Sequence, residues 1–279
     1  MELCLGATKM SLDEPRVMGI LNVTPDSFSD GGHFDRLDLA LRHAEEMALA
    51  GADFIDVGGE STRPGAAEVE VLEELGRVIP VVEHIKRSLD VAISIDTSKP
   101  EVMSEAVAAG AVLINDVFAL GRNGAVEAAA RSGAAVCLMH MLGTPQTMQV
   151  APHYDELPGD VIRFLQERVD VCVGGGISRE RLVVDPGFGF GKNDRHNLQI
   201  LRNLEQFSDL GLPLLVGLSR KRTLGKLTGR SAADRLAAGV AAATIAVLKG
   251  AHIVRTHDVA ATVDAVKVAR AVIRAGKEQ

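Results

Sequence analysis

Eight short apolar runs alternate with helical segments along the chain, and nearly every run ends at a polar side chain. The runs and the residues that end them are Val17–Leu21 with Asn22, Phe54–Glu60 with Ser61 and Thr62, Ala92–Ile95 with Asp96, Val112–Ile114 with Asn115, Ala135–Met139 with His140, Leu182–Val184 with Asp185, Leu214–Leu218 with Ser219 and Lys221, and His252–Val254 with Arg255 and His257. A parallel strand buried on both faces reads as a continuous Val/Ile/Leu run. Eight such strands separated by helices predict a (β/α)8 barrel, in which the residues just past the strands meet at one mouth.

The segments between these runs carry the periodicity of helices. Apolar residues recur at three- and four-residue steps in Leu37–Ala50, Leu72–Leu89, Val102–Ala109 and Ala125–Arg131. Several helices run into a Gly-Ala pair, and glycine is a favoured C-terminal cap. Because no linker or low-complexity segment interrupts these units, we expect a single domain over residues 1–279 with its barrel core at about residues 16–275. A barrel of this kind usually has about 250 residues.

Composition narrows the class of protein. Hydrophobic residues make up 47% of the chain and charged residues 24%, which is ordinary for a globular protein with a large core. The formal net charge of −7 gives no basic footprint, so we expect no nucleic-acid partner. Cys4, Cys137 and Cys172 form no CxxC pair, which indicates reduced thiols. The chain shows neither a signal-peptide pattern nor an apolar stretch long enough for a bilayer, so we expect a cytoplasmic protein without a membrane partner.

The connections after the first two strands are longer than the others. They run through Asp35 and through Ala66, and both are rich in Gly, Pro, Ser and Asp, which predicts loops. A long loop in a compact domain is usually functional or disordered. Because both loops lie at the mouth, they are candidate lids over a site. The alternative is a pair of solvated surface turns.

Eight short motifs lie at or near the predicted strand ends. They are Met18–Gly32 (MGILNVTPDSFSDGG), Asp56–Ala66 (DVGGESTRPGA), Ile95–Val102 (IDTSKPEV), Ile114–Val117 (INDV), Met139–Pro145 (MHMLGTP), Asp185–Lys192 (DPGFGFGK), Gly217–Arg222 (GLSRKR) and Arg255–Asp258 (RTHD). Taken together and in this order, they resemble the dihydropteroate synthase family over nearly the whole chain. One departure is Arg222, which stands where many family members have Ser after the Ser-Arg-Lys triplet.

The resemblance implies an alkyl-transferring enzyme of folate biosynthesis. In that reaction the amine of p-aminobenzoate attacks the methylene of 7,8-dihydropterin-6-ylmethyl diphosphate, and 7,8-dihydropteroate and pyrophosphate are formed. It also implies that sulfonamides compete with p-aminobenzoate and that the enzyme is a homodimer. The Ala-rich segments Ala232–Leu248 and Val259–Ala275 are candidates for the dimer surface.

The residues of the predicted mouth fit the chemistry of a pterin ring. The ring presents an amide and an amino group that Asp96, Asn115 and Asp185 can bind, while Lys221 can donate to its carbonyl and a ring nitrogen. A buried carboxylate needs such partners, because its burial otherwise costs several kcal/mol. The alternative for Asp96 and Asp185 is a structural capping role, and for Asn115 a turn. Two further predicted pterin contacts are Met139 and Gly217.

The diphosphate needs positive charge and hydrogen-bond donors. Arg255 and His257 follow one strand and are suited to phosphate oxygens. Asn22 is a candidate ligand for a Mg²⁺ cofactor that the diphosphate and water would complete; its alternative is a strand-end turn. Thr62 and Arg63, in the second loop, are placed to reach the leaving group or the second substrate.

We expect a largely dissociative displacement without a covalent enzyme intermediate. Stabilising the departing anion and shielding the cation-like methylene from water would account for most of the catalysis. The loops would close and form a p-aminobenzoate pocket from Phe28, Thr62, Pro64, Phe190 and Ser219. Asp35 is a candidate for stabilising the cation from the first loop. The predicted catalytic set is thus Asp35, Arg63, Lys221, Arg255 and His257.

Two features and two other functions are weighed against this interpretation. Gly187–Lys192 lacks the spacing of a phosphate-binding loop and is better interpreted as a turn that lets Phe190 face the site. His140 fits a hydrogen-bonded core residue better than a metal ligand. A methyltetrahydrofolate:corrinoid methyltransferase would use the same pterin residues but has no need of Arg63 or of the pair after the last strand. A non-catalytic pterin-binding paralogue would have no need of the intact set of Asn22, Arg63, Lys221, Arg255 and His257.

Overall fold

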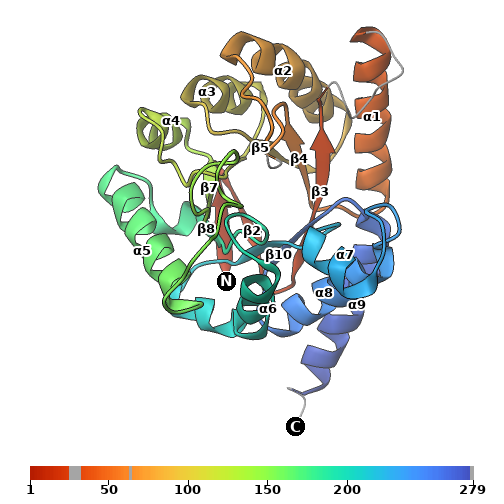
Figure 1. The fold of residues 1–279 in the computed structure, drawn as a ribbon. Coiled ribbons are helices and arrows are strands. Elements are labelled where there is room, and N and C mark those ends of the chain that lie inside the picture. The colour runs from red at the N-terminus through yellow and green to blue at the C-terminus, as the bar shows by residue number, and fades with distance from the viewer. Residues whose placement is uncertain (25–32, 63–64, 277–279) are drawn as a thin grey trace.

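Eight parallel strands curve into a barrel at the centre of the molecule (Figure 1). The computed structural model describes residues 1–24, 33–62 and 65–276, with the backbone alone at 33–36. In sheet order the strands are β8 (Leu182–Asp185), β7 (Ala135–Met139), β6 (Leu113–Asp116), β5 (Ala92–Asp96), β4 (Phe54–Gly58), β3 (Arg16–Asn22), β10 (Ile253–Thr256) and β9 (Leu215–Gly217). The ends of the sheet meet where Val184 pairs with Leu214 and its N–H donates to the Pro213 carbonyl at 2.9 Å. The predicted (β/α)8 barrel is confirmed.

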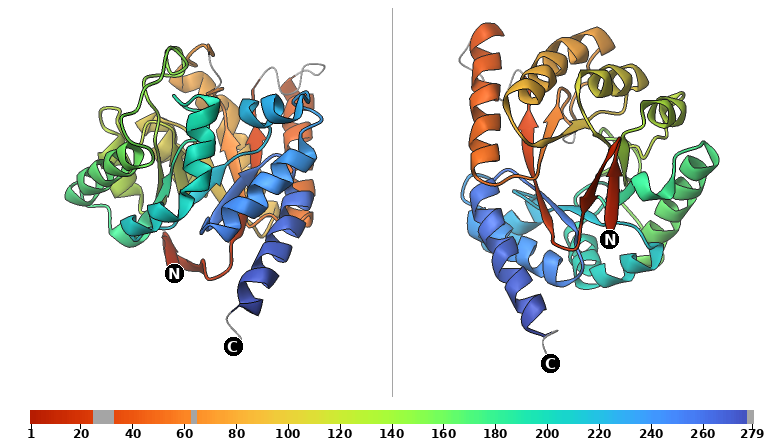
Figure 2. Two further views of the ribbon diagram at one scale, coloured as in Figure 1. Left: turned by 60° about the horizontal axis from the view of Figure 1, so that its bottom comes forward. Right: turned by 180° about the vertical axis from the view of Figure 1, so that it is seen from behind.

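Helices form the outer layer around this barrel (Figures 1 and 2). They are α1 (His33–Leu49), α2 (Val71–Ser88), α3 (Pro100–Ala109), α4 (Ala125–Ser132), α5 (Gly159–Gly174), α6 (Asp194–Arg202), α7 (Arg222–Thr228), α8 (Leu236–Leu248) and α9 (Val259–Ala275), with the 3-10 helices η2 (Arg179–Arg181) and η3 (Leu204–Leu210). Because α1 begins at His33, the expectation that the first loop runs through Asp35 is wrong. An acidic residue in the first turn favours a helix N-terminus. Within the described ranges, no helix has the length and hydropathy to cross a membrane.

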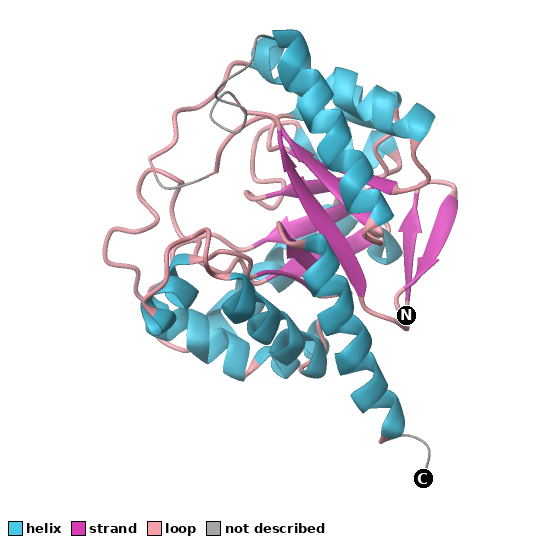
Figure 3. Ribbon diagram, turned by 90° about the vertical axis from the view of Figure 1, so that its right-hand side faces the viewer, coloured by secondary structure: helices cyan, strands magenta, loops and turns pink. Residues whose placement is uncertain are grey.

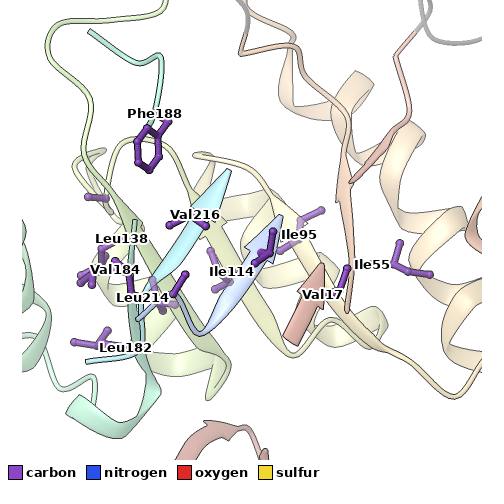
Figure 4. Close-up of a cluster of buried hydrophobic side chains, with 14 of the residues drawn as sticks. Val17, Ile55, Ile95, Ile114, Leu138, Leu182, Val184, Phe188, Leu214 and Val216 are labelled. Carbon is purple, nitrogen blue, oxygen red and sulfur yellow. The ribbon is translucent and has the colours of Figure 1, made fainter. Parts of the chain in front are cut away.

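The two faces of the strands have different tasks, because successive side chains in a strand point to opposite sides. Most outward residues are Val, Ile and Leu, and these pack under the helices in the main core cluster; Val17, Ile55, Ile95 and Val216 are examples (Figure 4). Deep in the barrel, the inward residues are also apolar: Met18, Phe54, Leu113, Val183, Leu215 and Ile253. Two residues further along, the same inward face carries polar groups, as at Asp56, Asn115, Asp185 and Arg255. The apolar layer therefore forms the floor of a polar mouth.

A short hairpin covers the end of the barrel opposite the mouth (Figures 2 and 3). Strands β1 (Glu2–Leu5) and β2 (Thr8–Ser11) pair antiparallel. Leu3, Leu5 and Leu12 are buried and pack against the apolar floor layer. These contacts extend the core beyond the predicted residues at about 16–275. Each strand has only four residues, the lower limit at which an alternation of apolar and polar residues indicates a strand, and Thr8–Ser11 shows no such alternation.

Candidate active site

Arg255 holds two carboxylates together in the middle of the mouth. Its Nε donates to Oδ2 of Asp56 at 2.6 Å, and its Nη2 donates to Oδ2 of Asp96 at 2.7 Å. The side-chain amide of Asn115 also donates to Oδ2 of Asp56, at 3.0 Å. The four side chains come from β10, β4, β5 and β6 and are largely buried. The mouth thus contains one guanidinium facing two carboxylates and an amide.

Burial and crowding shift the charges of this group. Burial raises the pKa of Asp96 to about 7, and repulsion from Asp56 adds to the rise while Arg255 opposes it. Burial also disfavours the charge of Arg255, but Asp56 and Asp96 outweigh it and raise the pKa of the guanidinium. Two carboxylates that share one cation cannot both ionise easily. Asp96 therefore sits near its titration point at neutral pH, whereas Arg255 stays charged.

Asp56 is a site residue that the sequence analysis missed. Its side chain is 0% exposed, it lies in the middle of β4, and its Oδ1 has no hydrogen-bond partner in the described part of the chain. Ser94, its neighbour in the β4–β5 register, has a buried hydroxyl that also lacks a hydrogen-bond partner among the described residues. The sequence pattern points only to the polar residues that end each apolar run. A carboxylate at an inward position within an apolar run was the available indication, since an unpartnered buried charge is costly.

Asp185 and Lys221 face the mouth from β8 and from the N-terminus of α7. Oδ1 of Asp185 accepts from the N–H of Gly187 at 2.7 Å, and burial raises the pKa of this carboxyl. The Lys221 ammonium lies 4.3 Å from the centre of the Phe190 ring. Burial, together with the charge of Arg255, lowers the pKa of Lys221 to about 8. Near pH 8 the lysine can therefore act as a donor or give up its proton.

An apolar patch and an open position lie next to these groups. Met139 belongs to a buried cluster with Val117, Met141 and Met148, and Phe190 packs against it. A Cβ built at Gly217 would meet no atom within 4 Å, so this inward position of β9 leaves open space. A flat ring has an apolar surface to rest on here, with polar groups along its edge.

The turn after β9 places Ser219 beside His257. Arg220 has a left-handed backbone with φ of 55°, and its guanidinium pairs with Asp258 at 2.6 Å. Strain of this kind costs about 1–3 kcal/mol and persists where the surroundings enforce it. Oγ of Ser219 accepts from the backbone N–H of His257 at 3.2 Å and lies 3.1 Å from Nδ1 of the His257 ring. Burial and the charge of Arg255 lower the pKa of His257 to about 4, so the imidazole is neutral at pH 7.

The glycine-rich turn after β8 is held by a buried lysine. Nζ of Lys192 lies 2.8 Å from Nδ1 of His140 and donates to the carbonyls of Gly187 and Phe190 at 3.0 and 2.9 Å. Burial, followed by the charge of Lys192, lowers the pKa of His140 to about 2. This agrees with the interpretation of His140 as a hydrogen-bonded core residue and of the turn as the support of Phe190.

The remaining predicted residues lie at the rim or outside the described residues. Thr62 lines a cavity of about 230 Å³ together with Asp96. Phe28, Arg63 and Pro64 lie outside the described residues, and only the backbone of Asp35 is described, in the first turn of α1. Arg222 is exposed at the first position of α7.

The side-chain oxygen of Asn22 at the rim is a suitable ligand for a magnesium ion that is held mainly by a substrate. Asn22 ends β3, and the register places it beside Gly58, which pairs in turn with Asp96. Oxygen ligands suit Mg²⁺, which usually binds through few protein groups together with substrate phosphates and water. The described residues contain no cluster of three or more His, Cys, Asp or Glu that forms a metal cage by itself. This donor set fits a shared site better than a permanent one.

Comparisons with known proteins agree with this geometry. The family model described as "Pterin binding enzyme" matches residues 18–257. The dihydropteroate synthase of Escherichia coli K12 is 54% identical over 275 residues, which cover 99% of this chain and 98% of that protein. This chain belongs to the dihydropteroate synthase family. A more distant member, from Synechocystis sp. PCC 6803, is 44% identical over 260 residues, or 92% of this chain and 90% of its own length.

Solved structures of the family share the fold over nearly the full length. A Yersinia pestis dihydropteroate synthase in complex with a sulfonamide drug has a TM-score of 0.94 and 52% identity, and covers 98% of this chain and 100% of its own. The enzyme from Xanthomonas albilineans in complex with 7,8-dihydropteroate has a TM-score of 0.89 and 49% identity, with 98% of both chains covered. The family therefore extends over the hairpin, the barrel and the mouth of this chain.

Proposed function

We propose that this protein is a dihydropteroate synthase, which joins 7,8-dihydropterin-6-ylmethyl diphosphate to p-aminobenzoate and releases pyrophosphate. The observation that carries the proposal is the convergence of Asp96, Asn115 and Asp185 on one buried mouth beside Lys221. These groups offer acceptors and donors for the edge of a pterin ring. Membership of the family and 54% identity to the Escherichia coli enzyme support it.

The pterin ring would lie over the apolar floor with its polar edge toward the carboxylates. Asp185 and Asp96 accept N–H groups, Asn115 can turn either its oxygen or its nitrogen to the ring, and Lys221 donates to the carbonyl. Met139 offers a soft apolar surface, and the open space at Gly217 leaves room for the ring. Burial strengthens each of these hydrogen bonds, because the electrostatic attraction between donor and acceptor is stronger at a low local dielectric than in water.

The diphosphate would lie at the rim, between Thr62, Asn22 and the end of β10. Arg255 supplies the fixed positive charge. The imidazole of His257 is neutral and would donate an N–H to the diphosphate. Asn22 would hold a Mg²⁺ ion, which neutralises charge on the diphosphate when it is bound. Arg63, which lies outside the described residues, is proposed to reach the same leaving group.

The reaction needs little covalent chemistry from the protein. As the C–O bond to the diphosphate breaks, the electron pair leaves with the diphosphate, and the methylene carbon becomes cation-like. The neutral aryl amine then forms the new C–N bond and gives up a proton to solvent. The work of Arg255 and Lys221 is to stabilise and orient these groups away from water. Phe28, Thr62, Pro64, Phe190 and Ser219 are proposed to bind p-aminobenzoate, with sulfonamides competing there, and Asp35 to face the cation.

Release of pyrophosphate tests this function. With both substrates and Mg²⁺, the purified protein should release pyrophosphate and form 7,8-dihydropteroate in equal amounts. Chelation should stop the reaction, and added Mg²⁺ should restore it. Absence of product with both substrates and Mg²⁺ would overturn the synthase proposal. Turnover that survives chelation would instead overturn only the role given to the metal and Asn22.

We also propose that the protein is a cytoplasmic homodimer, in keeping with three free cysteines and an exposed apolar face. On α8, Leu236, Ile245 and Leu248 are 44–48% exposed, and Val268 and Val272 of α9 are also exposed. Sedimentation should give twice the chain mass, and Ile245→Arg should shift it toward the monomer. Val171→Arg, an exposed apolar position on α5, is the matched control and should not. A monomer for the unaltered protein contradicts the proposal.

A further inference from the structure

Lys99 makes a buried ion network outside the groups described so far. Its ammonium donates to Oε2 of Glu74 at 2.5 Å and also to Oε2 of Glu60. The side chains of Lys99 and Glu74 are 6% and 0% exposed, and that of Glu60 is 20% exposed. The three residues come from different elements: the β5–α3 connection, helix α2 and the second long loop. We propose that Lys99 is a positioning residue, which with Glu74 fixes the start of the loop that carries Thr62.

The contacts around Glu60 tie the beginning of this loop to α2. Nη1 of Arg77 donates to the carbonyl of Gly59 at 2.6 Å. A Cβ at Gly59 would lie 2.8 Å from Val78 and 3.0 Å from Glu74, so the backbone rests directly on the helix. Glu74 is the fixed end of the network because it is fully buried within α2. Movement of the loop at Glu60 would separate its carboxylate from this ammonium.

The other end of the described loop is tied much less firmly. Glu68 pairs with Arg122 at 2.7 Å, but these side chains are 57% and 34% exposed. An exposed pair of this kind contributes little. The Gly65 N–H reaches the Pro145 carbonyl only at 3.4 Å. The largely buried anchor at Glu60 lies two residues before Thr62 and is the stronger of these two attachments.

The same network joins two walls of the cavity at the rim. One wall is formed by Glu60, Ser61 and Thr62, and the other by Asp96, Thr97 and Ser98, the residues that directly precede Lys99. A buried ion network is poor evidence for stability, because well-packed apolar groups often replace it without loss. Here Oε1 of Glu74 also lacks a hydrogen-bond partner in the described part of the chain, which adds to the cost. The advantage of the network lies in its geometry, because the one ammonium of Lys99 fixes the two walls relative to each other.

The inference rests on the proposed function, because it assigns the loop to p-aminobenzoate and the leaving group. Lys99→Met should raise the KM for p-aminobenzoate by about tenfold or more, since small displacements of positioning groups have large effects. Binding of a pterin without a diphosphate should stay within about twofold, because the floor contacts remain. Hydrogen exchange should become faster in residues 58–70 and stay unchanged elsewhere.

Three further variants keep the test decisive. Glu60→Gln leaves the Lys99–Glu74 pair in the core, so it should fold and show the same changes to a smaller degree. Lys99→Arg keeps the charge and should recover most of the lost affinity. Glu83→Gln, an exposed carboxylate on α2, is the control and should behave like the unaltered protein. Unchanged KM and unchanged exchange at residues 58–70 in both Lys99→Met and Glu60→Gln would overturn the inference.

The exchange measurement separates this inference from the proposed function. If the unaltered protein released no pyrophosphate, the function would fail, but exchange at residues 58–70 would still decide whether Lys99 anchors the loop. If Lys99→Met does not fold, Glu60→Gln decides in its place. Faster exchange throughout the chain in Glu60→Gln, with an unchanged KM, would mean a purely structural role and would also overturn the inference.

Discussion

Arg255 and Asp56 meet across the mouth of the barrel, where Nε of the guanidinium donates to Oδ2 of the carboxylate at 2.6 Å. They lie 199 positions apart in the chain, on two strands that are separated by β3. Asp96 accepts a hydrogen bond from Nη2 of the same guanidinium. One cation therefore organises both carboxylates before a substrate arrives. In its proposed role as a diphosphate ligand, Arg255 must also adjust these contacts when the substrate binds.

Replacing this cation should destabilise the protein in a pH-dependent way. Arg255→Met leaves Asp56 and Asp96 buried without their partner, which should lower the free energy of unfolding by about 3 kcal/mol at pH 8. A carboxyl whose folded pKa is raised destabilises the fold fully above that pKa, and the loss is relieved as the pH falls below it toward the lower pKa of the unfolded chain. We therefore expect a smaller loss at pH 5 in urea denaturation. Arg163→Met, which breaks an exposed pair with Asp160, should change little at either pH, and equal losses for the two variants contradict the prediction.

Pterin binding should strengthen as the pH rises through about 7. Asp96 must be ionised to accept an N–H of the ring, and its pKa is raised to about 7, chiefly by burial. Protonated Asp96 predominates below that value, so the affinity should fall on the acid side. Calorimetric titration of a pterin without a diphosphate, between pH 5.5 and 8.5, measures this step. Asp96→Asn should weaken binding by about 2 kcal/mol and remove the step; a step that persists in the variant would falsify this assignment.

The rate should fall again on the alkaline side because of Lys221. Its pKa is lowered to about 8, first by burial, and in its proposed role it would donate to the ring only while it is protonated. The profile of kcat/KM against pH should therefore have a descending limb near pH 8. Lys221→Arg should move that limb upward, since guanidinium keeps its proton, whereas Lys221→Met should lower kcat/KM by on the order of 100-fold. An unchanged limb in Lys221→Arg assigns it to another group.

The barrel and the convergence of its polar strand ends could be predicted because both follow from local patterns. Runs of Val, Ile and Leu mark the strands, and the closed parallel topology then carries Asp96, Asn115 and Asp185 to the same mouth. The pairing of Arg255 with Asp56 could not be predicted, because it depends on two side chains that meet across the interior. Asp56 was missed for a related reason. It lies within its strand, where only the inward direction gives it a role.

The charge of His257 also depends on tertiary surroundings. The sequence predicts a pair of phosphate ligands after the last strand, but burial and Arg255 keep the imidazole neutral at pH 7. Similarly, the sequence suggested a hydrogen-bonded His140, but not that its partner is Lys192, 52 positions away. Short-range patterns locate such residues. Their protonation states follow from neighbours that only the folded chain supplies.

The turn after β8 offers a test in which space and backbone conformation are separated. Gly187 has a φ of 68°, and a Cβ there would lie 1.9 Å from the carbonyl oxygen of His140. Gly176 also has a positive φ, 91°, but a Cβ there meets no atom within 4 Å. Gly176→Ala should therefore cost only the left-handed conformation, about 1–2 kcal/mol. Gly187→Ala should cost at least about 4 kcal/mol in urea denaturation, because the turn has to move. Since the Gly187 N–H donates to Asp185, that movement should also weaken pterin binding, which Gly176→Ala leaves intact; similar losses in both variants would mean that the turn has room to adapt.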